Sequence, residues 1–407
     1  MTLGRQIIAR RKLHSSTTTA FIAALSVSAL LAACIPQARS AEVAATPKAR
    51  PAVASTQTQT ALPQPAPSPA PVVPATVLTA QRILDARINE LGRAFNGDIG
   101  IAVKDIQTGW TSHYDGTTWY PQQSVSKFWV ALTALAEVDK GNLSLATPVT
   151  LGRDDLTLFH QPIRAMVLSG GYTTTPNDLL HRAIQQSDNT ANDFLLWRAG
   201  GPEAVRAYLD RMNIEGIRFG PGERALQSKI AGLEWKSSYS IGNNFYAARN
   251  AVPDAVRRQA FESYIANPMD GATPLGIVDA LARLKKGELL SPSSTALLLE
   301  IMSNTRTGPT RLKGGLSGGW RLAHKTGTGQ VFKGEQAGYN DIGIVTSPSG
   351  HSYAVAVLIR RTSAPNIQRM RTMQDTVRAI IDYHENLQGY TIAIDDREDG
   401  KIYRVGG

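Results

Sequence analysis

The stretch Ser124-Val125-Ser126-Lys127 joins a candidate nucleophile to the start of a helix. Apolar residues at helical spacing follow it, namely Phe128, Val130, Leu132 and Leu135. The spacing predicts that Ser124 lies in the first helical turn and that Lys127, one turn later on the same face, reaches the serine oxygen. A serine attacks efficiently only when a base takes its proton, and a lysine in a dry cleft can lose its charge and act as that base. The alternative is a capping serine beside a solvated lysine.

Two more polar motifs, Ser187-Asp188-Asn189 and Lys325-Thr326-Gly327, follow in the same chain. At ordinary composition, each is expected by chance in fewer than roughly one chain of this length in ten. Their ordered occurrence after Ser124 therefore indicates a shared site. Together the three motifs supply a nucleophile, proton carriers and a cation for a carboxylate, which acyl transfer through a serine requires.

The motif Ser187-Asp188-Asn189 follows apolar residues at helical spacing and is predicted to lie between two helical stretches. Ser187 can pass a proton to a leaving amine, and Asn189 can donate a hydrogen bond to an amide carbonyl of the substrate. Asp188 is expected to hold the loop by accepting backbone amides. An ordinary helix cap is the alternative.

The motif that begins at Lys325 is predicted to lie on a strand at the edge of a cleft. Lys325 and Thr326 can hold a carboxylate, and Gly327 lets the backbone come close to a ligand. The amides of Ser124 and Thr328 are expected to form an oxyanion hole. The alternative is a cationic edge strand that ends in a glycine turn.

The predicted elements are a helix, two strands, a long helical block, three strands and a closing helix from about Ile367 to Glu385. The alternation at Ile99, Ile101 and Val103 predicts a strand with one buried face. Strands from both ends are expected to share an antiparallel five-stranded sheet flanked by helices, with an all-helical lobe inserted between them. The fold class is therefore α/β, and a cleft is expected where sheet and lobe meet.

The N-terminal residues have the layout of a secretory signal, because basic residues at positions 5 to 12 precede an apolar run over 21–33. The run ends in Leu31-Ala32-Ala33-Cys34, which resembles a bacterial lipoprotein cleavage box. Residues 1–33 are therefore predicted to be a signal peptide of the lipoprotein type and Cys34, the only cysteine, to carry the lipid. An ordinary signal cleaved near Ala38-Arg39-Ser40-Ala41 is the alternative.

A linker is predicted over residues 34–76, because nine of the 22 prolines lie between Pro36 and Pro74 among Ala, Thr, Gln and Ser. Such a segment lacks the bulky apolar residues that offset chain entropy and should be an extended, disordered tether. The catalytic domain is predicted at 77–388 and a polar tail at 389–407.

The composition excludes some functions. The chain is 42% hydrophobic, enough for a sizeable core, and its net charge of +10 includes the basic residues of the signal. No basic run is interleaved with aromatic residues, so nucleic acid is not expected as a partner. The seven histidines show no pairing at metal-ligand spacing, so neither a metal nor another cofactor is predicted.

These motifs resemble those of the class A serine β-lactamases, in the penicillin-binding, serine acyl-transferase superfamily. The resemblance covers about residues 79–387. It extends to Ser187-Asp188-Asn189-Thr190-Ala191, to His324-Lys325-Thr326-Gly327-Thr328-Gly329 and to Asn340-Asp341-Ile342-Gly343-Ile344. It implies the β-lactamase/transpeptidase-like fold, an α/β sandwich with an all-helical lobe.

The resemblance also implies a glutamate that activates water for deacylation, within the pattern Glu-x-x-Leu-Asn. The stretch Glu223-Arg224-Ala225-Leu226-Gln227 stands at the matching position. Glu223 would hold the water, and Gln227 would replace the asparagine with a side chain one methylene longer. A surface glutamate beside an arginine is the alternative.

Departures from common members resemble the divergent second subclass of the family. Extra residues are expected between Gln227 and Pro268, next to the cleft, and Asp193 stands where many members have asparagine. In that subclass an arginine before the Lys-Thr-Gly strand assists carboxylate binding, and Arg311 matches it. A plain surface arginine is the alternative.

The predicted function is hydrolysis of the β-lactam ring. Ser124 attacks the ring carbonyl, and Lys127 and a water bound to Glu223 are the two candidate proton acceptors. Ser187 protonates the ring nitrogen, and Glu223 then activates water to release the acyl group. The alternatives are a penicillin-binding D,D-peptidase without that glutamate and a non-catalytic envelope-anchored binding protein. The protein is expected to be a periplasmic monomer, lipid-anchored to the outer membrane.

Overall fold

The computed structural model describes residues 74–399, with side chains up to residue 389. The predicted signal peptide 1–33, the predicted lipidation site Cys34 and almost all of the predicted linker 34–76 lie outside the described residues.

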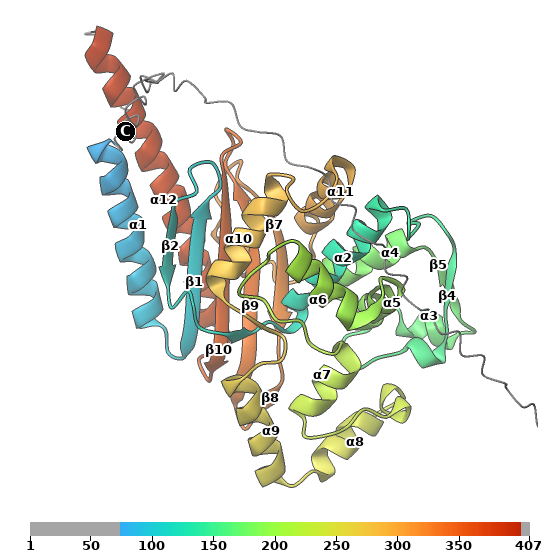
Figure 1. Ribbon diagram of the computed structural model, residues 1–407. Helices are drawn as coiled ribbons and strands as arrows, with labels where there is room; N and C mark the ends of the chain where they lie inside the picture. The colour runs from blue at the N-terminus through green and yellow to red at the C-terminus, as the bar shows by residue number, and fades with distance from the viewer. Residues whose placement is uncertain (1–73, 400–407) are drawn as a thin grey trace, which may run out of the picture. The chain divides into compact units, whose positions relative to one another are not determined.

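An antiparallel sheet of six strands lies at the centre of the described chain, in the order β2-β1-β10-β9-β7, with β8 paired to β9 (Figure 1). The strands are β1 (Asp98–Asp105), β2 (Thr111–Tyr114), β3 (Tyr120–Pro121), β4 (Val149–Leu151), β5 (Tyr172–Thr174), β6 (Gly271–Ala272), β7 (Arg321–Thr328), β8 (Val331–Phe332), β9 (Glu335–Thr346) and β10 (Ser352–Thr362). The prediction that strands from both ends share one sheet is confirmed, and the short β8 is an addition to the five predicted strands.

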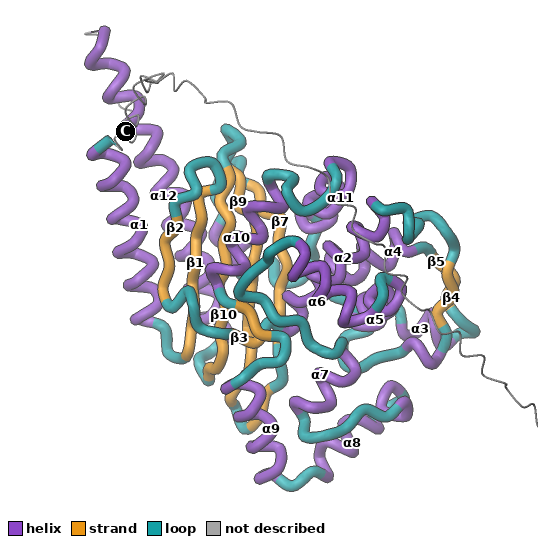
Figure 2. Tube along the Cα trace, in the orientation of Figure 1, coloured by secondary structure: helices purple, strands orange, loops and turns teal. Residues whose placement is uncertain are grey.

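The helices cover both faces of this sheet (Figure 2). They are α1 (Ala75–Ala94), α2 (Lys127–Asp139), α3 (Arg164–Leu168), α4 (Pro176–His181), α5 (Asn189–Arg198), α6 (Gly201–Arg211), α7 (Glu223–Ile230), α8 (Asn244–Ala251), α9 (Asp254–Ala266), α10 (Pro274–Lys285), α11 (Pro292–Ser303) and α12 (Asn366–Asp399). Helices α1 and α12 lie side by side on one face, and α10 packs on the other face with the helical lobe beyond it.

The prediction of one buried face for β1 was wrong, because both of its faces are buried. Ile101 belongs to the apolar core under α1 and α12, whereas the next residue, Ala102, belongs to the core under α10 and the lobe. A strand covered by helices on both sides has no polar face to show in its sequence. The alternation at Ile99, Ile101 and Val103 therefore marks the side of larger residues, and small residues fill the other side.

Helix α2 runs through the middle of the lobe and is buried nearly all round. Every residue from Lys127 to Ala136 is buried, and Trp129 is among the largest buried side chains. A helix that is apolar on all sides is stable only inside a core. The position of the motif at the start of α2 is therefore fixed by packing from every direction.

The segment between Gln227 and Pro268, where extra residues are predicted, carries α8 and α9. Two small apolar clusters hold this segment: one joins α7 and α9 to Phe332, and the other joins Phe245 on α8 to Leu158. A further set of ion pairs links α9 to the sheet through Glu262, Glu335, Arg258 and Arg361. The segment is thus packed beside the predicted cleft.

The closing helix is longer than the expected span from Ile367 to Glu385. Helix α12 continues to Asp399, so the first part of the predicted polar tail is helical. Helix α1 begins at Ala75, two residues before the predicted start of the domain. Across residues 74–399, none of the helices combines the length and apolarity needed to span a membrane.

Candidate active site

Ser124 lies in a 3-10 turn, Gln123–Ser126, that leads directly into α2. As the spacing predicts, Lys127 is close to it, and the Lys127 Nζ donates to Ser124 Oγ at 2.8 Å. Gln123 has a φ of +55°, in the left-handed region that non-glycine residues rarely adopt. Its backbone N–H donates to Asp270 Oδ2 at 2.8 Å, and this contact fixes the residue before the serine.

Lys127 and Glu223 form a buried ion pair behind the serine. The Lys127 Nζ bonds Glu223 Oε1, and both side chains are nearly inaccessible to solvent. Charges in such a place are stable only when paired and hydrogen-bonded. The ammonium group therefore connects the serine oxygen to the carboxylate.

Gln227 lies one turn after Glu223 on α7, so both side chains project from the same helix face. Its Nε2 donates to Gln123 Oε1 at 3.0 Å and to Glu223 Oε2 at 3.3 Å. Gln330 Nε2 donates to Gln227 Oε1 at 3.1 Å. These contacts place the longer amide at the edge of the carboxylate, where the predicted water would bind.

Asp193 fixes the first residues of α7 through their backbone N–H groups. It accepts the backbone N–H of Glu223 at 3.0 Å and that of Arg224 at 3.4 Å. Burial, followed by the nearby Glu223 carboxylate, raises the pKa of Asp193 to about 6. The residue noted in the sequence as a departure thus positions the predicted general base.

Ser187 and Lys325 meet on the opposite side of Ser124 from α7. The Lys325 Nζ donates to Ser187 Oγ at 2.9 Å and to the Thr326 carbonyl at 2.8 Å. Burial, with a further contribution from the Lys127 charge, lowers the pKa of Lys325 well below its usual range. Ser187 itself has a φ of +60°, because the chain turns sharply between α4 and α5.

Asp188 has the contacts predicted for it, whereas Asn189 makes a backbone contact that was not predicted. Asp188 accepts backbone N–H groups from Ile163 at 2.8 Å and from Ala191 at 2.9 Å, as expected for a residue that holds the loop. Burial raises its pKa. Asn189 Nδ2 donates to the Leu158 carbonyl at 2.8 Å, and because an amide nitrogen has two hydrogens, one remains for a ligand.

Strand β7 places the last motif at the cleft. Thr326 Oγ1 lies 2.6 Å from Thr307 Oγ1. The Arg311 guanidinium donates to Thr328 Oγ1 at 2.6 Å and to the Gly327 carbonyl at 2.9 Å. Arg311 is therefore buried and supports β7 through these hydrogen bonds. The alternative of a plain surface arginine was wrong.

Gly327 is required by packing within the protein, and its close approach to a ligand stays a prediction. A Cβ there would overlap the carbonyl oxygen of Gln122, next to the 3-10 turn that carries Ser124. The glycine therefore lets β7 pack directly against the backbone of the nucleophile turn.

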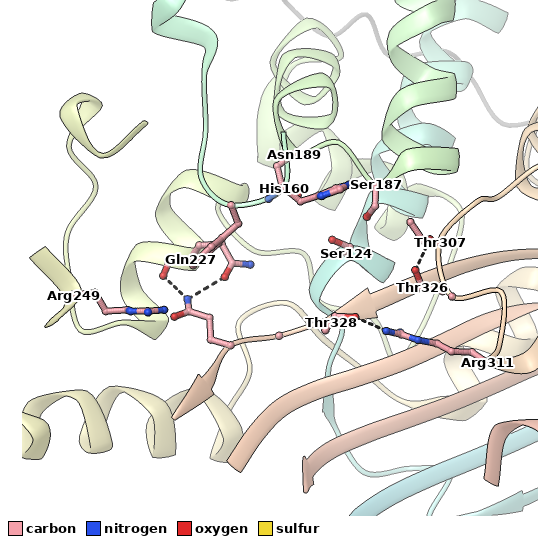
Figure 3. A pocket seen from close by; sticks show the side chains of 14 residues that line it. Ser124, His160, Ser187, Asn189, Gln227, Arg249, Thr307, Arg311, Thr326 and Thr328 are labelled. Carbon is pink, nitrogen blue, oxygen red and sulfur yellow. Dashed lines mark hydrogen bonds between the residues drawn. The ribbon is translucent and has the colours of Figure 1, made fainter. Parts of the chain in front are cut away.

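These residues surround a cavity of about 370 Å³ (Figure 3). Seven predicted residues line it: Ser124, Ser187, Asn189, Gln227, Arg311, Thr326 and Thr328. Four others, Lys127, Glu223, Lys325 and Gly327, lie behind the lining. Sequence reasoning missed the remaining lining residues, which are Phe159, His160, Arg249, Thr307, Gly308, Gly329 and Gln330.

The arrangement brings together the kinds of group that acyl transfer through a serine needs. It joins a serine hydroxyl to a lysine and a carboxylate on one side, and to a second serine and a second lysine on the other. Such paired proton carriers are what a covalent mechanism through serine requires. Among residues 74–389, whose side chains the structure describes, no group of three or more His, Cys, Asp or Glu is placed to hold a metal ion.

The family profile, the two related sequences and the solved structure described next are all of β-lactamases. A sequence profile of the Beta-lactamase enzyme family matches residues 83–384. Beta-lactamase VEB-1 of Pseudomonas aeruginosa is 28% identical over 304 residues, which cover 74% of this chain and 91% of the relative. Extended-spectrum beta-lactamase PER-1 of the same species is 32% identical over 242 residues, covering 59% and 68%. The crystal structure of a beta-lactamase from Chitinophaga pinensis has a TM-score of 0.61, with 27% identity, and covers 74% of this chain and 98% of its own.

Proposed function

Because the chain belongs to the β-lactamase enzyme family, as a class A serine β-lactamase, we propose that it opens the β-lactam ring through an acyl-enzyme on Ser124. The observation that carries the proposal is the continuous contact from Ser124 Oγ through Lys127 Nζ to Glu223 Oε1. This contact gives the serine proton a path into a buried carboxylate.

In the acylation step, Ser124 Oγ forms a bond to the ring carbonyl carbon. The hydroxyl proton passes to Lys127 Nζ as Lys127 releases a proton to Glu223, with which it is already in contact. Negative charge develops on the carbonyl oxygen, which the backbone N–H groups of Ser124 and Thr328 are proposed to bind.

Ring opening breaks the bond between the carbonyl carbon and the ring nitrogen. Ser187 gives its proton to that nitrogen, and Lys325, which donates to Ser187 Oγ at 2.9 Å, supplies a replacement proton. The lowered pKa of Lys325 favours release of that proton. The roles of Ser187 and Lys325 thus follow from one hydrogen bond.

Deacylation uses the opposite side of the site. Before deacylation, Glu223 loses to solvent the proton that it took from Lys127, and Lys325 regains one from solvent. Glu223 then takes a proton from a water molecule whose oxygen bonds to the acyl carbonyl carbon. The ester bond to Ser124 Oγ breaks, and Ser124 Oγ regains that proton through Lys127. Gln227, within 3.3 Å of the Glu223 carboxylate, is proposed to share the binding of that water. Asp193 keeps the carboxylate in place through the Glu223 backbone.

Substrate binding is assigned to the remaining lining residues. Thr326, supported by the charges of Lys325 and Arg311, is proposed to bind the ring carboxylate at the β7 side of the cavity. The free N–H of Asn189 is proposed to bind the amide carbonyl of the acyl side chain.

A test of the mechanism is the variant Glu223→Gln, which keeps the size of the side chain and removes its basicity. Intact-protein mass spectrometry after mixing with benzylpenicillin should show an adduct on Ser124 that forms more slowly, because Lys127 has lost its proton acceptor, and that then persists, with deacylation slowed by about 100- to 10,000-fold. Glu203→Gln, at an exposed site on α6, is the matched control and should turn over as wild type.

The two alternatives give different results in the same assay. If Glu223→Gln loses its adduct as fast as wild type, Glu223 is not the deacylating base. A slow wild-type adduct together with cleavage of a D-alanyl-D-alanine peptide would identify a D,D-peptidase. Absence of any adduct in wild type would identify a binding protein without catalysis.

A further inference from the structure

Arg249 brings an additional positive charge to the cavity that contains Ser124. It lies in the last turn of α8, in the segment between Gln227 and Pro268, and its side chain lines the same cavity. In Figure 3, Arg249 lies near Gln227 and is directed toward the cavity. The long segment therefore contributes a charged group to the site.

Aromatic rings fix the position of this guanidinium. Its central carbon lies 5.2 Å from the ring centroid of Tyr246 and 6.0 Å from that of Phe245. The two rings pack against Phe159, which also lines the cavity, at 6.1 and 5.1 Å. Stacking on aromatic faces restrains an arginine without neutralising its charge.

The charge of Arg249 has no anionic partner in the described part of the chain. None of the salt bridges among residues 74–389 includes it, and its Nε is buried without a hydrogen-bond partner. Burial, and then the charge of Arg257, lowers the pKa of Arg249. Two carboxylates of the following helix α9 already have partners: Glu262 pairs with Arg258 and Arg361, and Asp254 pairs with Lys333.

An incompletely solvated cation without a counter-charge favours the binding of an anion. The alternative role, a cation that stabilises the C-terminal end of α8, would require no ligand. That role does not explain why the side chain points into the cavity and not into the surrounding solvent.

The two arginines of the cavity lie on opposite sides of the nucleophile. Figure 3 shows Arg249 on one side of Ser124 and Arg311 on the other. In a bicyclic β-lactam, the ring carboxylate and the acylamino side chain likewise lie on opposite sides of the reactive carbonyl. When the ring carboxylate is bound at the Arg311 side, the acyl side chain extends toward Gln227 and Arg249.

We propose that Arg249 is a specificity-determining residue that binds a carboxylate on the acyl side chain of the substrate. β-Lactams with two negative charges, one on the nucleus and one on the side chain, are then preferred over the same nucleus with a neutral side chain. The inference rests on the proposed hydrolysis at Ser124 and adds the substrate class to it.

The test compares kcat/KM within matched pairs of penicillins. Carbenicillin and benzylpenicillin differ by a carboxylate on the side-chain α-carbon, and the adipoyl and hexanoyl amides of 6-aminopenicillanic acid differ by one at the end of a longer arm. In Arg249→Gln, the ratio of acidic to neutral substrate should fall about tenfold in at least one pair, the size expected for one charged hydrogen bond.

Two further variants separate charge recognition from general effects. Arg249→Lys should restore most of the ratio because it restores the charge. Arg198→Gln is the matched control, since Arg198 is exposed on α5, lies over the Phe194 ring and does not line the cavity. It should leave the ratio as in wild type.

Each outcome decides one question. If Arg249→Gln lowers kcat/KM equally for acidic and neutral substrates, or leaves both ratios unchanged, Arg249 does not recognise a side-chain carboxylate and this inference fails alone. If wild type hydrolyses none of the four penicillins, the proposed function fails, and the inference fails with it. Thermal unfolding of each variant identifies any loss of folded protein.

Discussion

Replacement of Asp193 by asparagine should change the stability of the protein in a way that depends on pH. The side chain is 2% exposed and lies under the start of α7, where it accepts the N–H groups of Glu223 and Arg224. Burial and the Glu223 carboxylate raise its pKa from 3.8 to about 6. The ionised form is therefore less favourable in the folded chain than in the unfolded one.

The magnitude follows from that difference in pKa. A rise from 3.8 to about 6 corresponds to about 3 kcal/mol of free energy between the two protonation states. Because the folded pKa of an acid is raised, the folded state binds more protons, and stability falls as pH increases. The penalty is absent below pH 3.8 and is complete above about pH 6.

Urea unfolding of wild type and Asp193→Asn between pH 4 and pH 8 measures this pH-dependent contribution to the free energy of unfolding. The variant loses acceptor capacity for Arg224, which costs about 1 kcal/mol at every pH. Relative to wild type, however, the variant should gain up to about 3 kcal/mol as pH rises from 4 to 7. Asp270, whose burial raises its pKa to about 7, contributes equally to both proteins and cancels in the difference.

The matched control is Asp210→Asn, at an exposed position on α6. Its stability difference from wild type should stay constant over the same range. A constant difference for Asp193→Asn as well, or one that falls with rising pH, would refute the reasoning that a buried, charged Asp193 opposes folding.

Two other predictions concern the support of the site. Tyr264→Phe removes a hydroxyl that accepts from Gln123 Nε2 at 2.5 Å and donates to Asp270 at 3.2 Å. It should lower the free energy of unfolding by about 1–3 kcal/mol in urea titrations, and a loss below 0.5 kcal/mol would contradict a structural role for this network. Gly329→Ala should prevent folding, because its Cβ would overlap a carbonyl oxygen of the paired strand, whereas Gly318→Ala, with open space around it, should fold with an unchanged melting temperature. The two glycine variants are compared by their soluble yield and their thermal unfolding. A stable Gly329→Ala protein would exclude the expected clash.

Contacts within one turn could be predicted from the sequence. Ser124 and Lys127 are three positions apart, and helical geometry alone brings such residues together, as the 2.8 Å contact confirms. Glu223 and Gln227 follow the same rule on α7. In each case the helical backbone between the two residues brings their side chains to the same face of the helix.

Contacts across the fold could not be derived from spacing. Ser187 and Lys325 are 138 positions apart, and their 2.9 Å contact depends on how β7 packs against the lobe. Only the order of the motifs and the family resemblance linked them beforehand. The spacing of residues along a helix or strand does not show how distant segments pack against each other.

Residues without a motif were missed for a related reason. Gln123 depends on Asp270, and Arg249 depends on a cluster of rings, and both sets meet only in the folded chain. A single glutamine or arginine has no periodicity that a sequence could reveal. Their signal would be covariation between positions, which one sequence does not contain.

The order of strands in the sheet has a consequence for the synthesis of the protein. Strand β1 pairs with β2, which follows it directly, and with β10, which begins at Ser352. A growing chain that has not reached Ser352 therefore has every catalytic motif but leaves one edge of β1 open. Closure of the sheet must wait for β10, so β1 stays paired on one side only until every catalytic motif has been made. Premature termination in β10 would leave an aggregation-prone edge and no partly working enzyme.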